Sequence, residues 1–346
     1  MAFKRLDPED FIVSSDSVTS TVWSNNSPSL NTYFTSSTQK EGTSGPYYLS
    51  VYQTASNSIS AAVQFQIAYA NKNGGGGVNF DSSVPFVSPT TTIYGQYRTL
   101  VLEDENAAFT WGPTYTGSAD NDFYVISIER ARYKQSLLPG SLNLILSSSN
   151  SNQAPLRLTD NSNMVTLPTF YGTMRAYQLI SGSDGSSHDG GTGYTLASGS
   201  YGLVLPDIST ILLNAAALND NSAAGGGINI GTITTADTFG DNPSRLYRHI
   251  SGSALVIPVA DPASSNIFEL NSQETLTSDY VFIRARNSEY NYTENPSFIS
   301  GSTGEVIYPY FINNPQTFPT TVGLYNDSND LLAVAKLSKP LQKDFT

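Results

Sequence analysis

The sequence predicts a mainly β protein, built from antiparallel, sandwich-like β domains with one or two short helices. Two observations lead to this fold class. Apolar and polar residues alternate with a period of two in many short segments, as in strands that bury one face. Charged residues make up only 13% of the 346 residues, while 21 Tyr and 16 Phe, which favour strands, are spread along the chain. A disordered chain would instead show few aromatic residues and a high net charge.

Strand-like segments recur from one end of the chain to the other. A Pro-Gly pair at Pro139-Gly140 separates two of them and is a strong turn signal. The last segment, Leu331–Leu337, fits either a strand or a short helix. The other predicted strands are Tyr47–Tyr52, Ala62–Tyr69, Phe123–Ile128, Leu142–Leu146, Tyr201–Leu205, Ala254–Val259, Tyr280–Arg286 and Gly304–Phe311.

Two helices are expected. The weaker prediction covers Tyr94–Glu105, whose β-branched and Tyr residues suit a strand as well. The stronger covers Ile208–Leu218, where apolar residues recur on one helical face. Asp207 could cap this second helix, and Asn219-Asp220-Asn221 would end it.

Three Gly- and Ser-rich segments are predicted to be loops. Asn71–Gly77 is expected to be a flexible loop, because no side chain in its run of glycines could order it. A phosphate-binding role is disfavoured because no Gly-Lys-Ser/Thr motif follows. Ser181–Gly193 and Asn219–Gly227 are expected to be linkers. Such loops could become ordered on assembly with other proteins.

The length of the chain favours two or three domains. We expect an N-terminal β domain at residues 1–136 and a middle β domain at 137–275, which holds the Gly/Ser-rich loops and the short helix. Residues 276–346 form a C-terminal β segment that could pack on the first domain. We also hypothesise that Met1–Asp16 is an arm threaded into another subunit, because the acidic run Asp7–Asp10 interrupts an otherwise apolar start.

Composition excludes several classes of function. The net charge of −12 and a pI near 4.5 disfavour nucleic acid as a partner, since binding a phosphate backbone needs clustered Lys and Arg. The absence of Cys excludes disulfides and thiolate metal sites. The chain shows no signal-peptide pattern and no apolar run long enough to span a bilayer. We therefore expect synthesis in a cytoplasm and no membrane insertion.

Candidate catalytic or metal-binding residues are few, and each fits a structural role better. His249 follows Arg248, an unfavourable neighbour for a metal ligand, and Asn291-Tyr292-Thr293 is a glycosylation sequon without a secretory signal. We therefore predict no catalytic, cofactor-binding or metal-binding residue and no enzymatic activity. The other clusters considered are Asp184, His188 and Asp189 as a metal trio, Asn326–Asp330 as a calcium-like loop, and Glu103–Glu105 and Asp120–Asp122 as paired carboxylates.

The abundant Tyr, Ser, Asn and Gly favour binding instead. Tyr supplies rigid contact area, and the small polar residues supply adaptable hydrogen bonds. Any single Tyr is explained better by packing on a sheet. Over the whole chain, however, this composition is typical of proteins that form large polar interfaces.

Several segments resemble a family of virion structural proteins from large contractile-tailed phages of cyanobacteria (cyanomyoviruses). The resemblance covers about two-thirds of the chain and is most specific toward the C-terminus. The similar segments are Tyr94–Arg98 (YGQYR), Asp122–Arg132 (DFYVISIERAR), Leu137–Ser141 (LLPGS), Ser200–Asp207 (SYGLVLPD), Thr277–Ser300 and Asn314–Lys336.

This resemblance implies a non-enzymatic structural component of a tailed-phage virion, in the tail or baseplate. Its partners would be other virion proteins, in multiple symmetric copies, and the particle would assemble in the host cytoplasm. Two alternatives stay open. One is a neck- or head-associated virion protein, and the other is a fibre-type module that binds a receptor or carbohydrate. A polysaccharide-degrading enzyme is the least favoured interpretation.

Overall fold

A computed structural model gives the fold. Its described part is mainly β, with antiparallel sheets, which confirms the predicted fold class, but it has four α-helices instead of one or two. No helix in this part is long and apolar enough to cross a membrane. The structure describes residues 5–30, 34–36, 47–78, 88–107, 109–111, 120–149, 155–188, 201–220, 226–237, 240–250 and 268–344.

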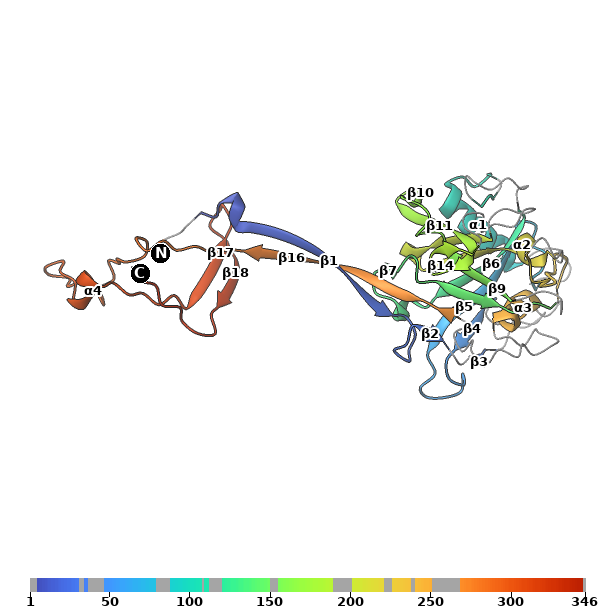
Figure 1. Ribbon diagram of the computed structural model, residues 1–346, viewed down its shortest axis with the longest axis horizontal. Coiled ribbons are helices and arrows are strands. Elements are labelled where there is room, and N and C mark those ends of the chain that lie inside the picture. The colour runs from blue at the N-terminus through green and yellow to red at the C-terminus, as the bar shows by residue number, and fades with distance from the viewer. Residues whose placement is uncertain are drawn as a thin grey trace. The chain divides into compact units, whose positions relative to one another are not determined.

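The chain forms two compact units. We call residues 16–276 the central unit, and residues 5–15 together with 277–344 the terminal unit (Figure 1). The predicted boundary between residues 136 and 137 falls inside the central unit, because β6 (Asp122–Ile128) pairs with β14 (Thr210–Asn214) in one sheet. The predicted boundary at 275/276 lies one residue from the observed division.

One long antiparallel sheet dominates the central unit (Figure 1). Its strands follow the order β2-β15-β8-β9-β11-β13-β14-β6-β5-β4-β3, with β10 and β12 attached to β11. The remaining strands of this sheet are β2 (Ser29–Leu30), β3 (Phe34–Thr35), β4 (Leu49–Tyr52), β5 (Val63–Asn71), β8 (Asn143–Leu146), β9 (Leu156–Asp160), β10 (Thr169–Tyr171), β11 (Met174–Ser183), β12 (Ser186–Ser187), β13 (Gly202–Leu205) and β15 (Phe268–Glu269).

The middle strands of this sheet are buried on both faces. Successive side chains of a strand point to opposite faces, so neighbouring residues of β6 enter different cores. Tyr124 and Ile126 belong to the first core, whereas Phe123 and Val125 belong to the second. This explains why these segments are almost continuously apolar in sequence, as is typical of strands covered on both sides.

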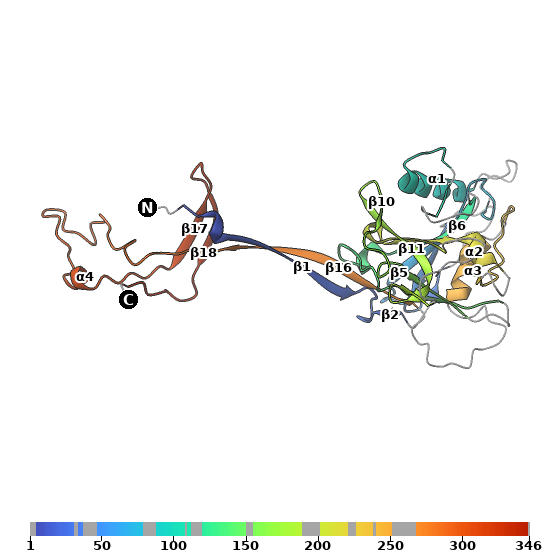
Figure 2. The same ribbon diagram turned by 45° about the horizontal axis from the view of Figure 1, so that its top comes forward.

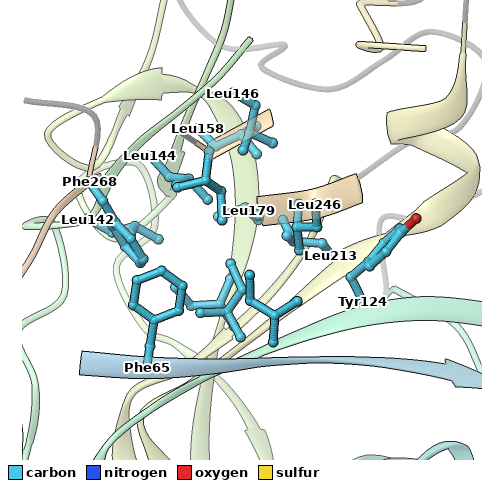
Figure 3. Packing of buried hydrophobic residues seen from close by; sticks show 14 of the residues in the cluster. Phe65, Tyr124, Leu142, Leu144, Leu146, Leu158, Leu179, Leu213, Leu246 and Phe268 are labelled. Carbon is cyan, nitrogen blue, oxygen red and sulfur yellow. The ribbon is translucent and has the colours of Figure 1, made fainter. Parts of the chain in front are cut away.

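The sheet doubles over, so that strands far apart in its order meet in the first core. The ring of Phe65 on β5 lies 5.3 Å from that of Phe268 on β15, and Trp23 lies 5.0 Å from Phe268. Figure 3 shows Leu142 and Leu144 near the ring of Phe268, which is paired with Leu144 across neighbouring strands. The packing is thus sandwich-like, as the sequence predicted.

Helix α1 (Pro89–Leu102) covers the second core on the other face (Figure 2). The side chain of Ser88, just before the helix, caps it by accepting the N–H of Thr90. An aromatic cluster fills the space below, with ring centroids of neighbouring pairs 4.8 to 6.2 Å apart; its members are Tyr94, Phe109, Trp111 and Phe123. The prediction of a helix at Tyr94–Glu105 was right in type and about five residues late at its start.

The prediction of a helix at Ile208–Leu218 was wrong over most of its length. Thr210–Asn214 is strand β14; Ile208 ends a short 3-10 helix, η3 (Pro206–Ile208), and only α2 (Ala215–Asn219) is α-helical. Every residue of β14 is buried, because one core lies on each face. A short run of this kind has no periodicity that separates a strand from a buried helix. Asp207 caps nothing here; its carboxylate accepts hydrogen bonds from Arg175 at 2.5 and 3.0 Å.

The segment Asn71–Gly77 is packed instead of flexible, so that prediction was wrong. Its four glycines are buried, and the Oδ1 of Asn71 accepts the N–H of Gly75 at 3.2 Å. A Cβ on Gly76, whose φ is +67°, would lie 2.2 Å from the carbonyl oxygen of Ile233. The glycines are therefore needed because two backbones approach closely here.

The other predicted linkers are structured where they are described. Residues 181–183 complete β11, and a tight turn at Asp184-Gly185, both with positive φ, leads into β12. Residues 189–193 and 221–225 lie outside the described residues. Helix α3 (Asp241–Ile250) was not expected, although an acidic first residue and apolar residues Leu246 and Ile250 on one face are helix signals.

The terminal unit contains short elements only. The prediction of a strand at Tyr280–Arg286 holds only to Val281, and Gly304–Phe311 is not a strand. The strand alternative for Leu331–Leu337 is confirmed, and Ala254–Val259 lies outside the described residues. The elements here are η1 (Pro8–Asp10), the start of β1 (Phe11–Thr21), the end of β16 (Asn271–Val281), α4 (Tyr310–Asn313), β17 (Thr321–Tyr325) and β18 (Leu331–Lys336).

Strands β1 and β16 lie side by side in a small sheet with β7 (Ser136–Leu137). Within the terminal unit, the N–H of Phe282 donates to the carbonyl of Asp10 at 2.8 Å. The buried carboxylate of Asp10 also pairs with Arg284 at 2.5 Å. The described residues of the segment proposed to thread into another subunit thus pair with their own chain.

Candidate protein interface

The carboxylates Asp120 and Asp122 are held by aromatic donors. The hydroxyl of Tyr69 donates to Asp122 at 2.7 Å, and the indole N–H of Trp111 donates to Asp120. Burial raises the pKa of Asp122, and the pKa of Tyr69 rises because of burial and this nearby carboxylate. A raised carboxyl pKa can mark an acid catalyst. Here Asp122 instead accepts a hydrogen bond from a residue of the first core, and Asp120 accepts one from a residue of the second core, so both fit a structural role.

Glu103, Asp104 and Glu105 form no paired site. Glu103 ends α1 in the left-handed conformation, with φ of +55°. Asp104 accepts the N–H of Asn106 at 2.8 Å, as Asp does in turns. All three are exposed, and they serve the turn that follows the helix.

The proposed metal trio is not assembled in the described part of the chain. Asp184 accepts a hydrogen bond from Asn143 at 2.8 Å, His188 is exposed, and Asp189 lies outside the described residues. Where side chains are described, no group of three or more His, Cys, Asp or Glu is placed to hold a metal ion.

His249 is a buried structural residue. Its Nδ1 lies 2.5 Å from the carbonyl oxygen of Ser147, which fixes α3 against the strand edge after β8. Burial lowers the pKa of His249, and the positive charges of Arg245 and Arg248 lower it further. The ring is therefore kept neutral by its surroundings.

Asn326–Asp330 is the turn between β17 and β18, as the turn interpretation predicted. The N–H of Asp330 donates to the side chain of Asn326 at 2.8 Å, and Asn329 adopts a positive φ of +63°. These contacts use the side chains of Asn326 and Asp330, two of the oxygen donors that a calcium ion would need.

A small hollow in the central unit is too small for a sugar. Its walls include Tyr47, Tyr48, Tyr69 and Pro243, and its cavity volume is about 20 Å³. A space of this size holds about one water molecule. It therefore offers no binding pocket for an organic ligand.

The terminal unit presents a different kind of surface. Of its described residues only Asp10 and Pro315 are buried. Eighteen large apolar side chains are exposed, many by half or more. They are Leu6, Phe11, Ile12, Val13, Tyr280, Phe282, Ile283, Tyr290, Tyr292, Ile307, Tyr308, Tyr310, Ile312, Phe318, Leu331, Leu332, Val334 and Leu341. We call this set the apolar surface of the terminal unit.

The start of β1 and strand β18 carry apolar residues on both faces. In β1, Phe11 and Ile12 are consecutive and so point to opposite faces, yet both are about half exposed. In the β17–β18 hairpin, Leu331 and Leu332 do the same, and all six residues of β18 are exposed. A strand facing water on one side would alternate polar and apolar residues. The start of β1 and strand β18 have instead the pattern of strands covered on both sides.

Comparisons with protein-family models, with curated proteins and with solved structures return no match to this chain. The apolar surface thus has to be interpreted from its own chemistry. Sequence reasoning predicted large interfaces from overall composition without locating them. The available signal was the pair of unbroken apolar runs Phe11–Val13 and Tyr280–Ile283.

Proposed function

We propose that this chain is a non-enzymatic structural component of a tailed-phage virion, located in the tail or baseplate. The observation that carries the proposal is the apolar surface of the terminal unit. Exposed apolar area of this extent is typical of protein–protein contact sites. A chain whose ends expose such a surface fits a role in assembly, and the sequence resemblance supplies the kind of assembly.

The chemistry of the central unit is consistent with this role. Its candidate acidic and His residues take part in turns, caps and buried hydrogen bonds. Short polar side chains also form buried hydrogen bonds within the unit. For example, Asn242 Nδ2 donates to the carbonyl oxygens of Gly76 and Ile233 at 3.0 and 2.8 Å. A rigid, internally satisfied fold of this kind suits a building block that keeps its shape in a particle.

Mass spectrometry of purified particles, split into heads and tails, tests the proposal. We expect the protein at fixed stoichiometry in the tail fraction of released virions. We also expect to find it inside the host cell before lysis. Recovery in the head or neck fraction would move the proposed position, and absence from both fractions would refute the role.

Two further assays separate the other classes of function. A fibre-type receptor or carbohydrate binder should bind purified host envelope on its own. A depolymerase should degrade capsular polysaccharide and lose that activity when Asp120 or Asp122 is changed to Asn. For a structural component we expect neither activity, with each assay calibrated by a known binder or enzyme.

A further inference from the structure

The apolar surface of the terminal unit is large enough for a stable interface. Eight of its side chains are aromatic, and each is exposed by 41 to 68%. An aromatic side chain buries about 150–250 Å² when covered, so these eight alone leave roughly 800 Å² open. That equals the area each partner contributes to a standard interface of about 1,600 Å². Ten exposed aliphatic side chains add to this area.

The β17–β18 hairpin also has few of the features that keep a free strand edge monomeric. Exposed edges are usually protected by a charged residue or Pro within the strand. The first five residues of β18, Leu331–Ala335, contain neither, and β17 contains none at all. The two strands form a sheet with no third strand among the described residues. A lone two-stranded hairpin is marginally stable in water, so this one needs a partner.

The apolar character of the surface favours another copy of the same chain as that partner, and the charge of the terminal segments does not oppose it. Residues 1–15 and 277–346 carry 7 Lys and Arg and 10 Asp and Glu, a net charge of −3. The rest of the chain carries 10 and 19, a net charge of −9. Both parts have about the same net charge per residue, and a net charge of −3 on the terminal segments leaves only weak repulsion between two copies there. Interfaces between identical subunits are also the more apolar class.

We infer that the terminal unit is a self-association module, whose apolar surface is covered by the same residues of further copies of this chain. The copies form a closed oligomer, in which the free edges of β17 and β18 are paired or covered. This inference deepens the proposed assembly role and rests on it. It identifies the first partner of the chain as the chain itself.

The test measures the mass of the purified full-length protein by light scattering coupled to size-exclusion chromatography. We expect the wild-type chain to be an oligomer of defined mass. The double variant Leu332→Glu/Val334→Glu places two charges on one face of β18 and should be monomeric. Ile59→Glu/Leu167→Glu, at exposed apolar positions of the central unit, should keep the wild-type mass.

Folding is monitored separately, because a variant that unfolds would also lose its mass. Both Trp residues, Trp23 and Trp111, are buried in the central unit, so Trp fluorescence should be the same in every variant. A second variant, Phe282→Ser/Ile283→Ser, weakens the same surface without adding charge and should also lower the mass.

Three results would overturn the inference: a monomeric wild-type protein, an unchanged oligomer in both terminal-unit variants, or polydisperse aggregates without a defined mass. A monomeric wild-type chain that is nevertheless present in virions would leave the proposed function intact and assign the surface to a different protein. A defined oligomer absent from virions would instead refute the proposed function.

Discussion

The two units of this protein use similar residues in opposite ways. In the central unit, consecutive apolar residues such as Ile211 and Leu212 are fully buried, one in each core. In the terminal unit, the consecutive residues Phe282 and Ile283 are both half exposed. The same pattern in sequence is therefore satisfied within the chain in one case and left open in the other. The central unit is stabilised by its own cores, and the terminal unit depends on a partner.

The largest effect is expected from Ile67→Ala. Ile67 lies on β5, is fully buried and belongs to the first core. Removing three carbons leaves a cavity, so the free energy of unfolding should fall by about 2–5 kcal/mol. Denaturant unfolding followed by Trp fluorescence measures it, because both Trp residues report on the central unit alone. A loss below 1 kcal/mol would mean that this core is loosely packed.

A slightly smaller effect is expected from Gly76→Ala. The new Cβ would have a positive φ and would meet the backbone oxygen of Ile233. Strain and overpacking together should cost about 2–4 kcal/mol in the same unfolding experiment. Gly231→Ala is the matched control. Its φ is +69°, but its nearest neighbour is the end of the Arg245 side chain, so only the backbone cost of about 1–2 kcal/mol should remain. Equal losses would show that close packing at Gly76 is unimportant.

A smaller, pH-dependent effect is expected from His249. Its pKa in the folded state is lowered from 6.5 by burial, so the unfolded chain binds more protons as the pH falls below 6.5. The central unit should therefore lose stability from that pH downward, until the lowered pKa is passed. In His249→Gln this loss should be absent, whereas in His188→Gln, at the exposed His, it should persist. Parallel pH profiles for all three proteins would contradict the assignment.

The smallest effect is expected from Ile312→Ala. This is the same change as at Ile67, but Ile312 is 69% exposed in the terminal unit. Its effect on the Trp-detected unfolding transition should be within 0.5 kcal/mol, as for most exposed positions. If the loss approached that of Ile67→Ala, the two units could not be independent in stability, and the comparison would fail.

The fold class and most strands of the central unit could be predicted, because their patterns are local. The strand at Phe123–Ile128 is an example: its β-branched and aromatic residues and its flanking turns are enough. Strand β14 could not be recognised in the same way. Its assignment depends on residues far away in sequence that cover both of its faces. The close packing of the glycines in Asn71–Gly77 could not be predicted for the same reason, since their neighbour Ile233 lies more than 150 residues away.

For the candidate sites, the sequence could show mainly which catalytic and metal-binding motifs they lack. For Asn326–Asp330, the local preference of Asn and Asp for turns was sufficient. The position of the interface was not predictable, because exposure of Phe11–Val13 and Tyr280–Ile283 depends on what the rest of the chain fails to cover. A strand with apolar residues on both faces has the same sequence pattern whether its faces are covered by the same chain or by another molecule.

The place of the central unit within the sequence also sets the order in which the two units are synthesised and can fold. The first half of the terminal unit ends at Ser15, and its second half begins at Thr277. A ribosome adding about 5–20 residues per second needs roughly 13–50 seconds to cover the interval. The central unit can fold during that time, while the early strand has no partner. The second half of the terminal unit is thus made after the central unit, so the surface inferred to bind another copy is assembled only when the central unit has had time to fold.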